Sequence, residues 1–165
     1  MVHEKEKETR ERVIAYIENH QEDFYRLAYS YTHDREMALD VVQDAIVKAI
    51  SKSDTLKNPE YLKTWFFRIL INEALSSLRK NKTILTDFDT QEIPVEDSHA
   101  EEAVDLFYAV QKLEPKLRTV IILRFYEDMK IEDIAKSCRT NVSTIKSRLY
   151  RALRLLKMNV SEEVM

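Results

Sequence analysis

The sequence predicts an all-α protein, and three features of its composition support this prediction. The 165-residue chain contains no glycine and only three prolines, so few positions interrupt a helix. Apolar residues make up 44% of the chain and charged residues 33%, which is the mixture that short amphipathic helices require. The lack of glycine also argues against nucleotide-binding α/β folds, because their phosphate loops need glycine for close backbone approach.

Charge divides the chain into two helical domains and a linker. The net charge is −3, but residues 87–105 contain 8 acidic and no basic side chains, whereas residues 106–165 contain 12 basic and 7 acidic ones. An acidic segment with little helical periodicity is typical of a solvated linker. We therefore expect a first domain over residues 1–86, an acidic linker over 87–100 and a second domain over 101–165.

In the first domain we expect helices over residues 8–32, 34–52 and 59–81. Asn58 and Pro59 are suited to the N-cap and first position of the last helix. For the helix over 34–52, the apolar spacing predicts a core stripe of Leu39, Val42, Ile46, Ala49 and Ile50. The other side contains Asp40, Asp44, Val47 and Lys48, with Gln43 at its edge. Two like charges one turn apart mildly destabilise a helix, so a basic partner would stabilise this face; chance surface acids are the alternative.

The helix over 59–81 presents two different faces. Its core-facing arc consists of Phe66, Phe67, Leu70, Ile71, Ala74 and Leu78. A second stripe, within about 80° on the helix, contains Tyr61, Trp65, Arg68, Asn72, Ser76 and Arg79. Aromatic rings beside cations and amides are what single-stranded nucleic acid requires, because bases stack on rings while cations contact the backbone. The alternative is that Trp65 belongs to the core.

In the second domain we expect helices over residues 101–113, 115–127, 130–138 and 142–158, the first opened by a capping box of Ser98 and Glu101. The last helix has an apolar sector formed by Val142, Ile145, Leu149, Ala152, Leu153 and Leu156. Its opposite side contains Ser143, Thr144, Ser147, Arg148, Tyr150, Arg151 and Arg154, flanked by Lys146 and Lys157.

A short helix, IEDIAKSC, precedes this amphipathic helix across a turn, and no acidic residue occurs from Lys136 to Lys157. This is the spacing of a helix-turn-helix, whose second helix presents hydrogen-bonding side chains to base edges and cations to phosphates. The alternative is a solvated basic face on an ordinary bundle helix, but such faces usually mix both signs.

Three segments in this order resemble the extracytoplasmic-function group of the bacterial sigma-70 family, the RNA polymerase subunits that recognise promoters. They are ALDVVQDAIVKAI, which is similar to the polymerase-binding helix of region 2, TWFFRILIN, similar to the promoter-melting helix, and IEDIAKSCRTNVSTIKSRLYRAL, similar to the region 4 helix-turn-helix. The resemblance covers about residues 20–158. The segments DFYRLAYSY and LRFYEDMKIEDIA are similar to a sigma-V-like subgroup.

The resemblance implies roles for named residues. The residues expected to bind the β′ clamp helices of core RNA polymerase are Asp40, Gln43, Asp44, Val47 and Lys48. The opened −10 element is expected to be bound by the loop 51–58 and by Tyr61, Trp65, Arg68, Asn72, Ser76, Arg79, Lys80 and Lys82. The −35 element is expected to be bound by Ser143, Thr144, Lys146, Ser147, Arg148, Tyr150, Arg151 and Arg154. Further expected partners are the polymerase β flap and a membrane-anchored anti-sigma factor.

The chain departs from the family pattern at three positions. Ser76 stands where an aspartate is usual, Arg139 stands where the helix-turn-helix turn normally has glycine, and Thr140 replaces an apolar residue. A left-handed residue at Arg139 costs a non-glycine side chain roughly 1 kcal/mol. We therefore expect the turn to differ from the usual one.

Two other functions are compatible with the same pattern: a stand-alone helix-turn-helix regulator, which would bind a palindromic site without polymerase, and a helical adaptor that contacts only proteins. An enzyme is not expected, because no nucleophile with a base, metal cluster or phosphate loop stands out, and no cofactor is expected either. Neither a signal peptide nor a membrane-spanning stretch is apparent, so we expect a cytoplasmic protein without membrane insertion.

Overall fold

The computed structural model describes residues 1–85 and 101–164, with side chains for residues 1–80, 106 and 108–157. Helices account for nearly all of these residues and no strand occurs among them, which confirms the all-α class. The predicted linker over 87–100 and the predicted capping residue Ser98 lie outside the described residues. Contacts divide the chain into two compact units, the first built mainly on residues 1–83 and the second mainly on residues 84–135 and 140–165.

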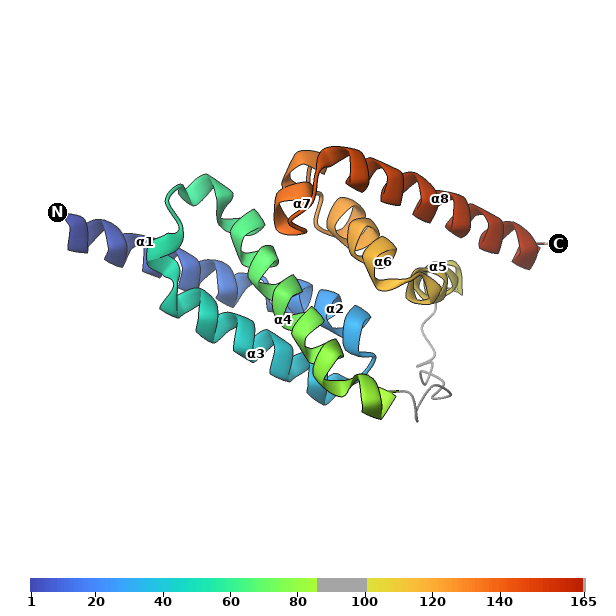
Figure 1. Ribbon diagram of the computed structural model, residues 1–165, viewed down its shortest axis with the longest axis horizontal. Helices are drawn as coiled ribbons and strands as arrows, with labels where there is room; N and C mark the ends of the chain where they lie inside the picture. The colour runs from blue at the N-terminus through green and yellow to red at the C-terminus, as the bar shows by residue number, and fades with distance from the viewer. Residues whose placement is uncertain (86–100, 165) are drawn as a thin grey trace. The chain divides into compact units, whose positions relative to one another are not determined.

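The first unit is a helical bundle that consists of α1 (Val2–Asn19), α2 (Gln21–Thr32), α3 (Arg35–Ser51), η1 (Ser53–Thr55), η2 (Pro59–Tyr61) and α4 (Leu62–Leu85). The loop with η1 and η2 joins α3 to α4 (Figure 1). Asn58 accepts a hydrogen bond from the Glu60 amide at 3.1 Å, as expected of the N-cap before Pro59. The helix therefore begins where the sequence predicts, although its first turn is a 3₁₀ turn.

The predicted single helix over 8–32 is wrong, because the chain breaks at His20. The backbone there leaves the helical region, at φ −128° and ψ 21°, and the His20 imidazole lies 2.8 Å from the Tyr16 carbonyl oxygen. The change of direction lets Phe24 of α2 pack against Phe66 of α4, with ring centroids 4.1 Å apart. Aromatic packing in the core therefore separates α1 from α2, although the sequence has no glycine or proline at this point.

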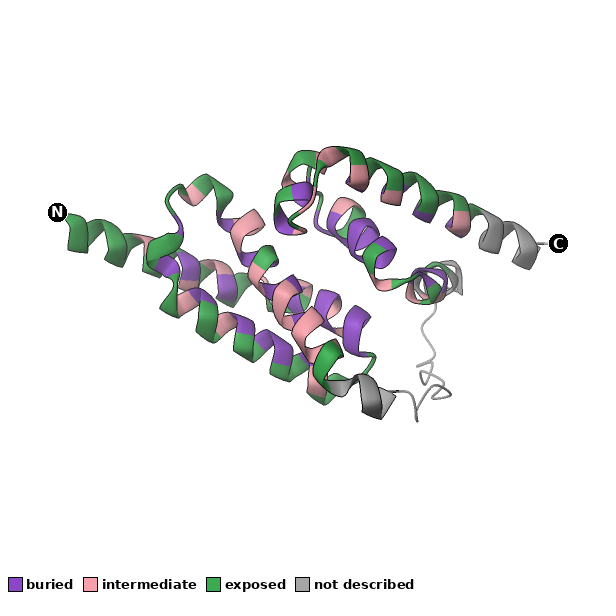
Figure 2. Cartoon of the chain, viewed as in Figure 1, coloured by how far each residue is buried: buried purple, intermediate pink, exposed green. Residues whose placement is uncertain are grey.

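The core of the first unit contains fully buried Phe24, Phe66 and Phe67. The first turns of α1 are exposed, and burial begins only at Val13 (Figure 2). The predicted core stripe of α3 is partly wrong, because Leu39 is 44% exposed. Val42 and Ala49 are buried as predicted, Ile46 and Ile50 are half-buried, and Ala38, Val41 and Ala45 are buried in addition. Small alanine side chains permit the close approach of α2 and α3, so the buried face is centred on them rather than on the larger residues.

The second unit consists of α5 (Glu101–Lys112), α6 (Pro115–Ile121), η3 (Ile122–Tyr126), α7 (Ile131–Ser137) and α8 (Val142–Val164). Both α5 and α6 pack against α8. The guanidinium of buried Arg118 donates to the carbonyl oxygens of Gln111 and Leu113, at 3.0 and 3.1 Å, and thereby satisfies the end of α5. The second unit therefore has a core of its own around α6.

Two predictions for the second unit need correction. The helix predicted over 115–127 ends in a π-helical turn, η3, in which the Glu127 amide donates to the Ile122 carbonyl oxygen at 3.1 Å. In α8, Leu153 is 39% exposed, whereas Ile145, Leu149, Ala152 and Leu156 are buried. That buried set follows a spacing of four, three and four residues, so Leu153 lies at the edge of the face that packs on α5 and α6. No helix in the described residues is long and apolar enough to span a bilayer.

Candidate nucleic-acid interface

The polar stripe predicted on the melting helix lies at the surface of the first unit. Tyr61, Arg68, Arg79 and Lys80 are exposed, and Trp65, Asn72 and Ser76 are partly exposed, so none of these side chains belongs to the core. The side chain of Lys82 lies outside the described residues. The interpretation of Trp65 as a core residue is therefore wrong.

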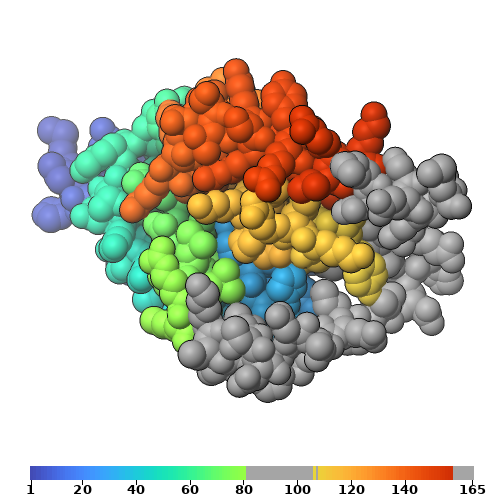
Figure 3. Space-filling model, turned by 45° about the vertical axis from the view of Figure 1, so that its right-hand side comes forward, coloured from blue at the N-terminus to red at the C-terminus, as the bar shows by residue number. Residues whose placement is uncertain are grey.

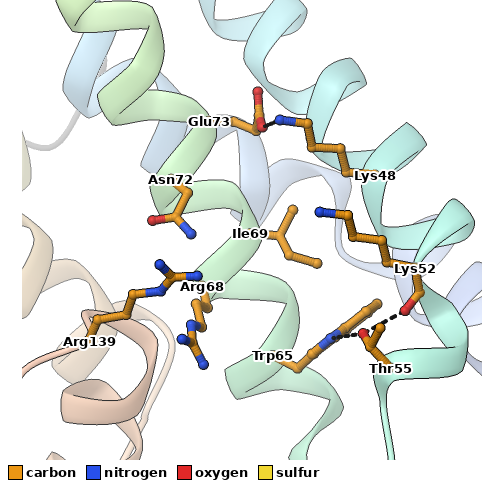
Figure 4. A pocket seen from close by; sticks show the side chains of 9 residues that line it. All are labelled: Lys48, Lys52, Thr55, Trp65, Arg68, Ile69, Asn72, Glu73 and Arg139. Atoms are coloured by element: carbon orange, nitrogen blue, oxygen red, sulfur yellow. Dashed lines mark hydrogen bonds and ion pairs between the residues drawn. The ribbon is translucent and has the colours of Figure 1, made fainter.

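Trp65 is oriented by the loop that precedes α4. Its indole N–H donates to the Thr55 hydroxyl at 3.2 Å, and the Thr55 hydroxyl donates to the Lys52 carbonyl oxygen at 2.7 Å (Figure 4). The 3₁₀ turn η1, which holds Thr55, closes with a bond from the Leu56 amide to the Ser53 carbonyl oxygen. The loop predicted to act together with Trp65 is thus hydrogen-bonded to it, through a residue that the sequence analysis did not single out.

A hollow lies between α3, η1 and α4, and these elements, with Lys52 between α3 and η1, supply eight of the side chains drawn in Figure 4. They are Lys48, Lys52, Thr55, Trp65, Arg68, Ile69, Asn72 and Glu73. Cations outnumber acids among them, so the hollow favours a polyanion. Lys48 forms an ion pair with Glu73, which joins α3 to α4. The sequence analysis missed Glu73, because nothing in its local pattern shows that it faces a lysine 25 residues away.

The predicted polymerase-docking residues Asp40, Gln43, Asp44 and Val47 are exposed on α3. Leu39, which the sequence analysis placed in the core, is also exposed on this helix and adds apolar surface to it. The fifth predicted residue, Lys48, is exposed as well but pairs with Glu73 across the hollow. The acidic group and Leu39 therefore form a candidate protein-binding face, and Lys48 belongs structurally to the hollow.

The turn between α7 and α8 keeps the left-handed backbone that glycine normally provides, so the expected departure from the usual turn is not seen at Arg139. Arg139 has φ 55°, in the left-handed region, and the Thr140 amide donates to the Ala135 carbonyl oxygen at 3.0 Å. Asn141 caps α8, because its side-chain oxygen accepts from the Thr144 amide at 2.8 Å. This arrangement sets the beginning of α8, where Ser143 and Thr144 lie.

The polar side of α8 is open to solvent. Exposed positions are Ser143, Lys146, Ser147, Tyr150, Arg151 and Arg154, and half-buried ones are Thr144 and Arg148. In the space-filling view α8 is orange to red and forms part of the visible surface (Figure 3). Arg151 lies 3.9 Å from Glu114, and both of these side chains are largely exposed. The second unit also exposes Phe125, at 57%, and Tyr126, two apolar positions that the sequence analysis did not single out.

Comparison with known proteins gives the same two regions in the same order. Residues 16–84 match Sigma-70 region 2, and residues 104–156 match Sigma-70, region 4. The chain is 41% identical over 162 residues to the RNA polymerase sigma factor SigV of Bacillus subtilis (strain 168), covering 96% of this chain and 97% of that protein. It is 26% identical over 164 residues to the ECF RNA polymerase sigma factor SigX of the same strain, covering 90% of this chain and 84% of SigX.

Solved structures that superpose on this chain include sigma factors as well. The sigma factor RpoE of Bartonella quintana, in complex with the anti-sigma factor NepR, superposes with a TM-score of 0.72 at 28% identity, covering 89% of this chain and 97% of that one. CnrH, in complex with the cytosolic domain of CnrY, gives a TM-score of 0.67 at 21% identity, covering 91% of this chain and 88% of that one, which supports the fold. The sequence match thus agrees with the structure, which has two helical units, a hydrogen-bonded tryptophan on α4 and a helix-turn-helix. The chain belongs to the extracytoplasmic-function sigma factors of the sigma-70 family, in which it is similar to SigV.

Proposed function

We propose that this chain directs core RNA polymerase to promoters through two separate DNA-binding faces. The first unit opens and holds the −10 element, and the second unit recognises the −35 element as duplex. The observation that carries this proposal is the pairing, in one chain, of an aromatic and cationic face on α4 with a polar and cationic face on α8, in which no acid occurs from Val142 to Lys157. The two faces suit different forms of DNA, single-stranded for α4 and duplex for α8.

Docking on polymerase is assigned to the exposed face of α3. Asp40, Gln43 and Asp44 offer carboxylate and amide groups to basic partners, and Leu39 and Val47 offer apolar surface beside them. Exposed apolar residues ringed by polar ones are typical of protein-binding surfaces. We assign this face to the β′ clamp helices. In the second unit, exposed Phe125 supplies apolar surface suited to the β flap.

Strand opening is assigned to α4 and the loop before it. An unpaired base can stack on the Trp65 ring, whose orientation the bond to Thr55 restricts. Arg68, Arg79, Lys80 and Lys82 supply cations for the backbone, and Asn72 supplies an amide for a base edge. Base stacking on a ring contributes roughly 1–3 kcal/mol, which offsets part of the cost of unpairing.

Recognition of the −35 element is assigned to the polar side of α8. Ser143, Thr144 and Ser147 lie near the beginning of the helix and can contact base edges in the major groove. Further along, Arg151 and Arg154 can contact phosphates, and Arg148 lies between the two groups. Lys146 and Tyr150, on the same side of α8, are assigned additional contacts to the −35 element.

Regulation by an inhibitory partner follows from the same surfaces. The similar sigma factor from Bartonella quintana was crystallised with an anti-sigma factor. A protein that covers the α3 face or the polar side of α8 would prevent polymerase or DNA from binding. We therefore propose that a membrane-anchored anti-sigma factor holds this chain inactive in the cytoplasm, and that the chain itself is not an enzyme.

Run-off transcription with purified chain and core polymerase on a promoter library tests the function. We expect transcripts that begin at a shared pair of −35 and −10 sequences, and only when both proteins are present. Failure to bind the core enzyme would contradict the proposal. Selective binding of the chain alone to a palindromic duplex would instead indicate a stand-alone regulator.

A further inference from the structure

The hollow contains a slot whose two ends differ chemically. Trp65, Ile69 and Glu73 are spaced four residues apart on α4 and therefore share one side of the helix. Lys48 of α3, Lys52 after it and Thr55 of η1 face them (Figure 4). A rise of 1.5 Å per residue separates Trp65 from Glu73 by about 12 Å along the helix. The slot thus has a ring at one end, an ion pair at the other and Ile69 between them.

The tryptophan end suits the flat face of a nucleobase. The indole N–H of Trp65 is bonded to Thr55, so the ring supplies an apolar surface and its only donor is already used. Ile69 is partly exposed beside it and extends the apolar surface. Contacts at this end favour any base, because every base has an apolar face.

The opposite end contains a carboxylate, which is unusual for a site that contacts a polyanion. Glu73 is the only acid among the described residues that line the hollow, and its side chain is 12% exposed. Lys48 pairs with it and offsets the repulsion that it would exert on phosphate. An ionised carboxylate only accepts hydrogen bonds, and it has about four acceptor positions. Pairing with Lys48 therefore leaves Glu73 able to accept from a base.

We propose that Glu73, held by Lys48, selects adenine or cytosine at one position of the −10 element, through the amino group at C6 of unpaired adenine or C4 of unpaired cytosine. Adenine and cytosine present an amino donor at the ring position where guanine and thymine present a carbonyl oxygen. The proposed contact is to this ring position alone, where the carboxylate accepts from an amino group and repels a carbonyl oxygen, and it does not reach the adjacent ring N–H of guanine or thymine. This inference rests on the proposed strand-opening role of α4, and it moves Lys48 from the polymerase-binding group to the DNA-binding group.

Holoenzyme binding to fork-junction DNA with an unpaired −10 strand tests the proposal. Each cytosine is replaced in turn by uracil, and each adenine by hypoxanthine, because both replacements exchange the amino group for oxygen. With the unsubstituted chain, one position should lose about tenfold in affinity, equivalent to about 1.4 kcal/mol. With Glu73→Gln, that loss should fall below about threefold, because an amide can donate as well as accept.

Two further variants keep the test specific. Glu18→Gln removes an exposed charge on α1 and should retain the tenfold preference. Lys48→Met should weaken binding to all templates and leave affinity for core polymerase unchanged; loss of core affinity would return Lys48 to the polymerase-binding group and overturn that part of the inference. Full base preference in Glu73→Gln would overturn the selection role alone. A holoenzyme that binds none of the templates would overturn the proposed function, and this inference with it.

Discussion

At Arg139 the backbone adopts φ 55°, a conformation that glycine tolerates and other residues do not favour. Replacement Arg139→Gly should therefore raise the free energy of unfolding of the second unit. Arg139→Ala is the matched control, because it removes the same side chain and keeps the Cβ atom that causes the strain. We expect the glycine variant to be about 1 kcal/mol more stable than the alanine variant.

Chemical denaturation followed by circular dichroism measures this difference. Equal stability of the two variants would show that the turn relaxes its backbone when Arg139 is replaced.

Trp65 and Arg148 belong to different faces, so their loss should affect different steps. Trp65→Ala should spare binding to core polymerase and reduce strand opening by roughly tenfold or more, since stacking contributes about 1–3 kcal/mol. Arg148→Ala should reduce initiation on duplex promoters and spare it on templates melted in advance. Permanganate reactivity of the −10 strand and run-off transcription measure the two steps. Equal defects of both variants in both assays would refute this division of labour.

Among the helices, α8 depends on its cap. Asn141 accepts from the Thr144 amide at 2.8 Å, and Asn141→Ala should cost about 1 kcal/mol in unfolding free energy. Asn141→Asp retains an accepting side chain and should lose much less. Hydrogen exchange at the amides of Ser143 and Thr144 measures the local effect. Unchanged exchange in Asn141→Ala would mean that packing alone holds the first turn of α8.

The sequence predicts helices best where the apolar spacing is regular and the ends are marked. The cap at Asn58 before Pro59 and the buried face with Phe66 and Phe67 agree with expectation, whereas Arg139 keeps the usual left-handed turn although the sequence predicts a different turn there. The break at His20 could not be predicted, because it depends on the packing of Phe24 on Phe66, 42 positions later in the chain. Periodicity locates a helix, but tertiary packing decides where it bends.

The same limit applies to the candidate site. The stripe on α4 could be predicted because its members share one helix. The Trp65–Thr55 bond and the Lys48–Glu73 ion pair join different elements, so only the folded chain shows them. The face of α3 was partly misjudged at Leu39, because alanines rather than large side chains determine how closely α3 approaches α2.

For the whole molecule, each unit alone should bind DNA weakly. The five cations of α8 from Lys146 to Lys157 can contact three or four phosphates, which gives a slope of roughly −3 for log affinity against log salt and dissociation constants of about 10⁻⁴ to 10⁻⁶ M. Docking on polymerase fixes both units, so binding of one promoter element raises the effective concentration of the other, by a factor of roughly 10² to 10⁴ in affinity.

Fluorescence anisotropy of labelled promoter DNA over a range of salt concentrations checks this expectation, with the isolated chain and the holoenzyme compared directly. Tight and sequence-selective binding by the isolated chain would contradict it.

The charge of the acidic linker should also affect how the whole chain binds polymerase. Residues 87–100 lie outside the described residues, but their charge suggests a path along a basic channel of the polymerase. Neutralising Asp87, Asp89, Glu92, Glu96 and Asp97 together should weaken holoenzyme assembly or alter promoter escape. Assembly assays and abortive-transcript ratios measure the two effects, and no change in either would remove the electrostatic explanation.

The π-helical turn η3 contains one residue more than the same turn of an α-helix would need. Deleting a single residue within Ile122–Tyr126 would let this turn close as an ordinary α-helical turn, because the wide turn already absorbs the extra residue. Deleting a residue from the regular turns of α6 would instead rotate the chain that follows by about 100° about the helix axis. The direction in which Ser143 and Arg148 point is thus insensitive to a shortening of η3 and sensitive to a shortening of α6.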